Sequence, residues 1–324
     1  MIKILDNVKP YNKFFLISCF NQEQAAVYEH YGVDDRWYIA NNFLVHKYNR
    51  RLHTCSCSLK NLLSEKSIEK LTGIKTISAV SSNDIIKDVI DFIDAGCPVI
   101  VFLDSFEMPQ KDDAYQKLHI SHAVLIYGYD TEKGIFYDID FKYNNNYTYE
   151  NKTIPFADVE NAYESFERYL RHNKETKSIY AFKKVGEAAR FDPSVFQKRY
   201  KQFLPIAKAS YEEAKAYLEY AHDLCLNEKR LKKNAEKFKD NLIKLKWDKL
   251  GQRHQFEYVF SDRALTDTAD RIHDNYNFIS SVVFKYCFTK KYSRESMEQC
   301  AVRIEEIICL EFQILNALRE KAAA

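Results

Sequence analysis

Three side chains that are far apart in the sequence, Cys19, His122 and Asp140, have the types that nucleophilic catalysis needs. A thiol becomes a strong nucleophile when a neighbouring base takes its proton, and an imidazole is the usual base near neutral pH. A carboxylate on the other side of the imidazole fixes its tautomer and its orientation. In this chain order the three residues predict a nucleophile, its base and the group that orients the base.

Cys19 stands where a helix is expected to begin. Ser18 is a good N-cap residue, and apolar residues then recur at helical spacing until a stop at Gly32. A short apolar run, residues 14–17, precedes the cap. In a first helical turn, unpaired backbone N–H groups and the helix dipole lower the pKa of a thiol and can hold an oxyanion. We therefore expect a reactive thiol at Cys19.

Residues 119–140 predict a β-hairpin that positions the other two side chains. Two runs of β-branched and aromatic residues flank a polar turn closed by Gly134. His122 opens the first strand and Asp140 closes the second, so antiparallel pairing brings them together. Asp138 projects from the same strand face two residues earlier, and either carboxylate could reach His122. The position nearer the strand end favours Asp140.

The length and composition narrow the classes of function. The 324 residues carry 48 Lys and Arg against 46 Asp and Glu, whereas a nucleic-acid-binding protein is expected to be strongly basic. Aromatic residues, 15% of the chain, are sufficient to line an apolar pocket. The eight cysteines show no disulfide-like spacing and no run approaches the roughly 20 apolar residues of a membrane span. We expect a cytoplasmic protein that binds neither nucleic acid nor membrane.

Turn-forming residues divide the chain. Six of the seven glycines precede residue 190, and no proline follows Pro205. This predicts an α+β domain over residues 1–188, in which the helix bearing Cys19 packs on an antiparallel sheet, and an all-α region over residues 189–324. Helical patterns cover residues 193–226, 228–248, 255–289 and 293–320, and a further helix is expected at 58–71. Residues 33–60 predict an irregular segment beside the site.

A second group of potential ligands is His46, His53, Cys55 and Cys57. Thiolates and imidazoles suit zinc. However, Cys-x-Cys is not the usual zinc spacing, and no second pair of ligands follows. The sequence therefore predicts no metal site and no bound cofactor.

Several motifs carry a family resemblance: the Cys19 helix, the apolar run 98–104, a loop with Pro109 and Tyr115, and the run 119–130. Together they resemble the N-terminal domain of the butirosin-biosynthesis acyltransferase family, over roughly residues 14–185. That family is a branch of the papain-like cysteine-protease fold that moves acyl groups from carrier-protein thioesters onto amines. The chain is also similar in size and layout to a cysteine-protease-like enzyme that forms amide bonds in closthioamide assembly.

The resemblance implies roles and partners. Cys19, His122 and Asp140 would be the catalytic triad, and the acyl donor would be the phosphopantetheine thioester of an acyl or peptidyl carrier protein. A small amine would be the acceptor, and the helical region would shape the acyl pocket, dock the carrier protein or form a homodimer, although simple packing explains it as well. Papain-like enzymes often use an upstream glutamine in the oxyanion hole. Here Asn12 and Lys13 stand upstream.

Some assignments stay open at this point. Asn12 is a candidate for the second oxyanion donor, but a surface turn after Pro10 is the simpler interpretation. His119 either lines the pocket or faces solvent. The expected function is amide-forming acyl transfer in antibiotic or other secondary-metabolite biosynthesis. The alternatives are a cysteine peptidase or isopeptidase with the same triad, and a non-catalytic binding module on a degenerate enzyme fold.

Overall fold

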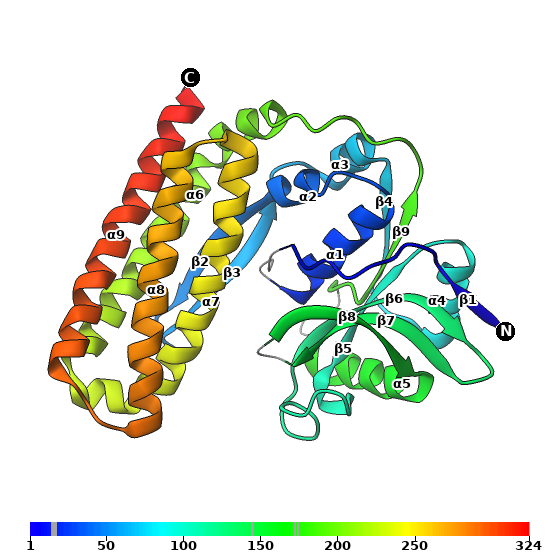
Figure 1. The fold of residues 1–324 in the computed structure, drawn as a ribbon, viewed down its shortest axis with the longest axis horizontal. Helices are drawn as coiled ribbons and strands as arrows, with labels where there is room; N and C mark the ends of the chain where they lie inside the picture. Colours follow the sequence, from blue (N-terminus) through cyan, green and yellow to red (C-terminus); the bar gives the residue numbers. More distant parts are fainter. Residues whose placement is uncertain (14–17, 144–145, 172, 174, 324) are drawn as a thin grey trace. The chain divides into compact units, whose positions relative to one another are not determined.

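The chain folds into two units, seen in the computed structural model of Figure 1. The structure describes residues 1–13, 18–143, 146–171, 173 and 175–323, so the apolar run 14–17 lies outside the described residues. The first unit comprises Met1–Trp37 and Ser64–Phe191, and the second comprises Tyr38–Leu63 and Asp192–Ala324. The sequence analysis placed a single boundary at 188/189. The structure instead groups residues 38–63 with the helical unit.

The first unit is built on a seven-stranded antiparallel sheet. Its strands follow the order β4-β9-β5-β6-β7-β8, and β1 pairs with β6. The strands are β1 (Ile2–Ile4), β4 (Ile74–Ala79), β5 (Val99–Asp104), β6 (Ser121–Asp130), β7 (Ile135–Tyr143), β8 (Asn146–Pro155) and β9 (Ile179–Lys184). The helices are α1 (Cys19–His30), α3 (Glu65–Thr72), α4 (Ile85–Asp94) and α5 (Phe156–Ser165), which continues into a π-helical turn, η2 (Phe166–Leu170).

Strand β5 shows how this sheet is covered on both faces. Val101 belongs to a buried core with residues of α4 and α5, whereas the neighbouring Phe102 stacks on Phe20 of α1 with ring centroids 5.4 Å apart. Successive side chains of a strand point to opposite faces, so α1 packs on one face and α4 and α5 on the other. The almost wholly apolar run at 98–104 predicted a central strand, and β5 indeed lies between β9 and β6.

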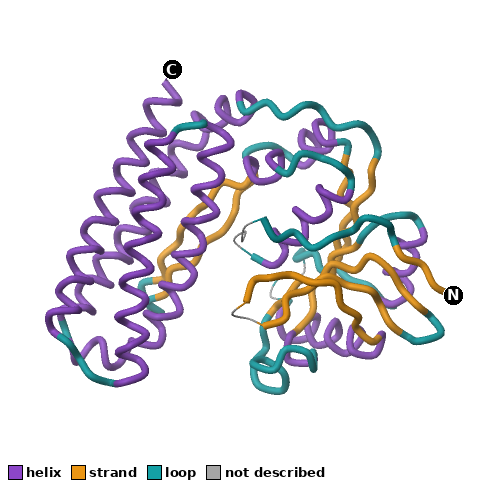
Figure 2. The backbone as a smooth tube through the Cα atoms, in the orientation of Figure 1, coloured by secondary structure: helices purple, strands orange, loops and turns teal. Residues whose placement is uncertain are grey.

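The second unit consists of a β-hairpin and four long helices (Figure 2). The hairpin is β2 (Asn42–Asn49) and β3 (Thr54–Asn61), preceded by the short helix α2 (Arg36–Asn41). The long helices are α6 (Ser194–Leu226), α7 (Glu228–Phe260), α8 (Arg263–Thr289) and α9 (Arg294–Ala323). The predicted break between residues 248 and 255 was therefore wrong, because α7 continues to Phe260 and α8 begins at Arg263. Within the described residues, no helix has both the length and the apolar character needed to cross a bilayer.

The prediction of an irregular segment at 33–60 was also wrong, as was the start of the helix expected at 58–71. Residues 54–61 form strand β3, and α3 begins only at Glu65. Long-range hydrogen bonds hold the hairpin in its unit. Ser210 accepts from the backbone N–H of His46 at 2.8 Å, and Asn241 accepts from that of Cys55 at 3.2 Å. Both partners lie on helices more than 150 residues later in the chain, beyond the reach of a local pattern.

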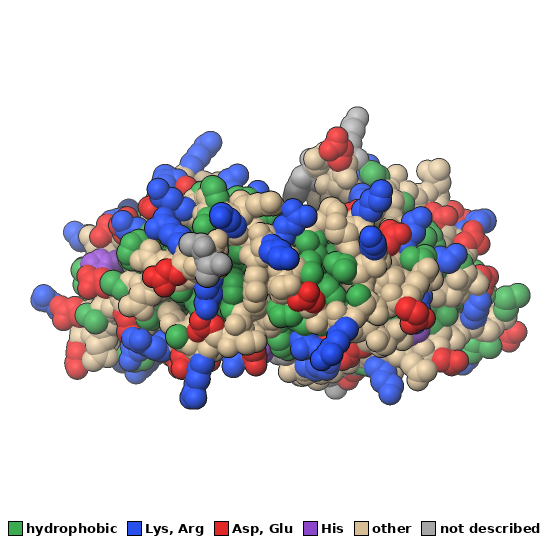
Figure 3. Space-filling model, turned by 90° about the horizontal axis from the view of Figure 1, so that it is seen from above, with side chains coloured by type: hydrophobic (Ala, Val, Ile, Leu, Met, Phe, Trp, Pro, Cys, Tyr) green, Lys and Arg blue, Asp and Glu red, His purple; other side chains and the backbone are tan. Residues whose placement is uncertain are grey.

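The surface agrees with the nearly balanced charge of the sequence. On the face drawn in Figure 3, Lys and Arg side chains are interspersed with Asp and Glu over each unit. Many charged side chains of the long helices form pairs within one helix, such as Lys215 with Glu219 and Arg294 with Glu298. Exposed pairs of this kind contribute little to stability, so the fold depends mainly on its buried apolar faces.

Two glycines in the first unit allow the cost of a left-handed backbone to be compared with the cost of a steric clash. Gly73 and Gly96 both adopt left-handed φ angles, +66° and +77°. A methyl group at Gly73 would lie 2.2 Å from the carbonyl oxygen of Gly186, whereas one at Gly96 would meet no atom within 4 Å. We expect Gly96→Ala to lower the free energy of unfolding by about 1–2 kcal/mol from the left-handed conformation alone.

Gly73→Ala should cost a further ~1–3 kcal/mol because backbone atoms must move apart. Urea denaturation of the two variants beside the wild type measures the difference. Equal losses in both variants would show that Gly186 does not approach Gly73 as the structure has it.

Candidate active site

The β6–β7 hairpin brings His122 and Asp140 together, which confirms the predicted hairpin. The turn contains Gly134 at φ +65°, and His122 Nε2 lies 2.8 Å from Asp140 Oδ1. Both side chains are buried, with 4% and 0% of their surface exposed. Asp140 Oδ1 also accepts the backbone N–H of Phe141 at 2.7 Å, which fixes the carboxylate. Of the two carboxylates that the sequence left open, Asp140 is the one in contact with His122.

Cys19, about a hundred residues earlier in the chain, lies next to the strand that carries His122. It is the first residue of α1, and Ser18 caps the helix by accepting the N–H of Asn21 at 3.3 Å. The Cys19 Sγ accepts the backbone N–H of Ala123 at 3.4 Å, so the sulfur lies beside the strand position that follows His122. Because Nε2 of the His122 imidazole is hydrogen-bonded to Asp140, Nδ1 is the ring nitrogen that can accept a proton from the thiol.

The electrostatics of the thiol differ from the sequence expectation. Burial raises the pKa of Cys19 to about 12, and the nearby Glu23 and Asp140 add to the rise. Backbone N–H groups of Ala123 and Phe20 act in the expected direction and lower the pKa, but they do not outweigh burial. The pKa of Cys19 is thus raised where the sequence predicted it to be lowered, because desolvation outweighs the backbone N–H groups of the helix start, although the residue keeps part of its surface exposed.

Burial also lowers the pKa of His122, although the charge of Asp140 opposes that change. Both shifts favour the uncharged forms of the thiol and of the imidazole. In this state His122 can accept a proton as the thiol attacks, which is general-base activation of the nucleophile. A preformed thiolate is not needed for that chemistry.

Lys111 is a member of the cluster that the sequence analysis missed. It lies in the long connection between β5 and β6, is only 2% exposed, and places Nζ 2.6 Å from Asp140 Oδ2. The ammonium also lies 3.8 Å from the centroid of the Phe141 ring. Burial alone raises the pKa of Asp140, but His122 and Lys111 more than reverse this and bring it to about 2. A lysine in a polar loop normally faces solvent, so its type and position gave no signal.

Two further buried carboxyl groups adjoin the cluster. Glu23 lies one helical turn after Cys19, and burial, with Asp140 and Asp138 adding, raises its pKa well above the usual range. Burial and the charge of Asp140 raise the pKa of Asp138 from 3.8 to about 8. Both groups are therefore mainly protonated at neutral pH. Asp140 keeps its negative charge because it alone has two cationic or hydrogen-bonding side chains against it.

Two other sequence candidates lie outside this cluster. The side-chain amide of Asn12 donates to the backbone carbonyl of Tyr149 at 2.8 Å and accepts its N–H at 2.9 Å, so it holds β8. His119 forms a separate pair with Asp104, with Nδ1 2.6 Å from Oδ2, and stacks on Phe106. It is 38% exposed, and this pair fixes the connection between β5 and β6.

Comparison with known proteins agrees with this geometry. Residues 18–170 match the model of the Peptidase_C39 like family, a span that contains Cys19, His122 and Asp140. No curated protein matches the chain. The first unit has its N-terminal helix on an antiparallel sheet, and the long helices follow it in the chain. Together with the family match, this confirms the predicted α+β class with a papain-like cysteine-protease domain.

The Lys111–Asp140 ion pair predicts a pattern in a double-mutant cycle. Asp140→Asn leaves a buried lysine without its counter-charge, and we expect it to lower the free energy of unfolding by about 3–5 kcal/mol. Adding Lys111→Met removes that unpaired cation, so the double variant should recover most of the loss. Urea denaturation of the two single variants and the double variant measures the coupling. Losses that simply add would show that the two groups are not paired.

Asp138 predicts a pH dependence of stability. Between about pH 4 and pH 8 the folded protein holds this proton while the unfolded chain has released it, so stability falls as pH rises. One such group contributes a slope of about 1.4 kcal/mol per pH unit. Asp138→Asn should remove that slope and melt at a higher temperature than the wild type near pH 8.

Thermal unfolding across this pH range tests the expectation. Glu132→Gln, which changes an 87% exposed carboxylate, serves as the control and should keep the wild-type slope. The same decline in Asp138→Asn and in the wild type would mean that Asp138 is ionised in the folded protein.

Proposed function

We propose that the protein is an amide-forming acyltransferase that carries the acyl group on Cys19. The observation that supports this most directly is the buried His122–Asp140 pair beside the Cys19 sulfur, within the part of the chain that matches a cysteine-peptidase-like family. The thioester donor and the amine acceptor come from the resemblance to the butirosin-type acyltransferases. The donor would be the phosphopantetheine thioester of a carrier protein, and the acceptor a small amine.

The first half-reaction forms the acyl-enzyme. As Cys19 Sγ attacks the thioester carbonyl, its proton moves to Nδ1 of His122, and the negative charge develops on the carbonyl oxygen. Asp140 holds Nε2–H and stabilises the imidazolium that results. Collapse of the tetrahedral intermediate breaks the bond to the phosphopantetheine sulfur. That thiolate takes the proton from His122 and leaves, while the acyl group stays on Cys19.

The second half-reaction releases the amide. A neutral amine attacks the acyl-enzyme carbonyl and gives a proton to His122. The Cys19 thiolate is then the leaving group, and the imidazolium returns the proton to it. Amide formation requires that the amine reach the acyl group ahead of water. The burial of His122 and Asp140 supports this, because it limits the water around the base.

A cysteine peptidase or isopeptidase is the second candidate. The name of the matching family favours it, and the same three side chains would act, with water as the second nucleophile. The two functions differ in the donor they accept and in the fate of the acyl-enzyme. A carrier-bound thioester should load the acyltransferase and should not load a peptidase.

Intact-protein mass spectrometry after mixing with an acyl-carrier thioester tests the proposal. We expect a single acyl addition that accumulates without amine and disappears, with amide formed, when a suitable amine is added. Cys19→Ala should not load at all, and His122→Ala should load about 100 to 10,000 times more slowly, as expected for loss of a general base.

Cys309→Ser is the matched control, because Cys309 is exposed and lies in the helical unit. It should load and transfer at the wild-type rate. Full loading of Cys19→Ala would contradict the proposed nucleophile. Cleavage of peptide substrates without loading from any thioester would favour the peptidase.

A further inference from the structure

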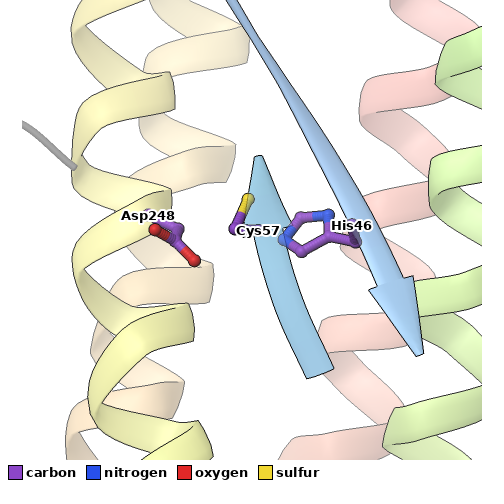
Figure 4. Close-up of side chains that lie close together, drawn as sticks. All are labelled: His46, Cys57 and Asp248. Atoms are coloured by element: carbon purple, nitrogen blue, oxygen red, sulfur yellow. The ribbon is translucent and has the colours of Figure 1, made fainter. Parts of the chain in front are cut away.

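The second unit contains a cluster of three side chains that the proposed acyl transfer does not use. His46 on β2 and Cys57 on β3 are directly opposite each other in the hairpin, and directly opposed residues share one face of the two-stranded sheet. Asp248 of α7 approaches them from the helices, as Figure 4 shows. One ligand atom from each of the three residues lies within 4.8 Å of the other two.

This cluster is built into the interior of the unit. His46 and Asp248 are 8% and 5% exposed, and Cys57 is half-buried. Ser210 of α6 holds His46 twice: its Oγ accepts the backbone N–H at 2.8 Å and lies 3.3 Å from Nδ1 of the ring. A hydrogen bond to one ring nitrogen fixes the tautomer and leaves the other nitrogen as a ligand, which is the usual arrangement around metal-bound histidines.

We propose that His46, Cys57 and Asp248 bind a divalent transition-metal ion, with Zn²⁺ as the ion that best fits the three donors. An imidazole nitrogen, a thiolate and a carboxylate are the ligand types that zinc takes, and a tetrahedral ion would have one position left for a fourth ligand.

The charges of the surroundings agree with a bound dication. A thiolate from Cys57 and the carboxylate of Asp248 together balance two positive charges. The buried Lys249 next to Asp248 is already paired with Glu311, Nζ lying 2.6 Å from the carboxylate, so it adds no net charge. A metal ion at this position would leave the cluster neutral, and a neutral cluster is the state that a low-dielectric interior favours.

The site departs from the sequence analysis, which grouped four residues of one segment and predicted no metal. Of those four residues, His46 and Cys57 are the ones that form the cluster with Asp248. His53 instead stacks on Tyr220, with ring centroids 4.2 Å apart. The third ligand lies about 190 residues after the second, so no spacing rule within the hairpin could have found it. A bound ion would join the hairpin to α7 and stabilise the second unit.

Cobalt titration tests the proposal, because Co²⁺ replaces Zn²⁺ in such sites and absorbs light. The full chain carrying Cys19→Ala is used, so that the thiol of the candidate active site cannot bind the ion. After treatment with a chelator we expect one equivalent of Co²⁺ to bind, with a thiolate-to-cobalt charge-transfer band and visible bands of a tetrahedral ion. Zn²⁺ should displace it and raise the melting temperature.

Variants assign the ligands. Cys57→Ser should abolish the charge-transfer band, and His46→Gln or Asp248→Asn should weaken binding about 100-fold or more. Cys55→Ser is the matched control, because Cys55 is buried two residues earlier on the same strand and is not one of the three ligands. It should retain the band. Circular dichroism establishes whether each variant is folded. If Cys57→Ser does not fold, the Co²⁺ affinity of Asp248→Asn, which keeps the side-chain size, tests the site.

Two results would overturn the proposal. One is folded Cys19→Ala protein that binds no Co²⁺ with a thiolate band. The other is binding that survives His46→Gln and Asp248→Asn unchanged, which would place the ion elsewhere. In either case the three residues would be an internal hydrogen-bonded cluster only. Neither result bears on acyl transfer, which is measured separately at Cys19.

Discussion

The candidate active site depends on one buried negative charge, the carboxylate of Asp140. A carboxylate with no exposed surface remains ionised only where cations and hydrogen-bond donors replace water. His122, Lys111 and the backbone of Phe141 supply these contacts from β6, the connection before it and β7. Burial and the charge of Asp140 raise the pKa of Glu23 and of Asp138, and the cations and backbone N–H groups near them do not reverse that rise. Of these three buried carboxyl groups, the one that contacts an imidazole and an ammonium is therefore the one that carries the negative charge.

Local signals were sufficient for the elements that carry the site. Ser18 and Gly32 marked the two ends of α1, and Gly134 marked the turn of the hairpin, because caps and turns are determined by a few adjacent residues. The roles predicted for Cys19, His122 and Asp140 then followed from the position of each residue at the end of a helix or strand. The preference for Asp140 over Asp138 rested on its place near the strand end, and the contact with His122 agrees with it.

What the sequence did not predict depends on burial and on distant partners. Lys111 and Asp248 are charged residues in polar surroundings, and nothing local indicates that they are buried. The raised pKa of Cys19 follows from packing around the start of α1, which outweighs the helix dipole. The β2–β3 hairpin donates backbone N–H groups to Ser210 and Asn241, which lie on helices far along the chain. Each of these features requires the three-dimensional neighbourhood, which a periodic pattern does not contain.

The assignment of residues 38–63 to the helical unit has a consequence for synthesis on the ribosome. The hairpin leaves the exit tunnel well over a hundred residues before the helices whose side chains bond to its backbone. At a translation rate of about 5–20 residues per second, the hairpin is without those partners for on the order of ten seconds. During nascent-chain growth the first unit can be completed by its own residues, whereas the earlier-made hairpin lacks the partners on which its backbone hydrogen bonds depend until α6 and α7 emerge.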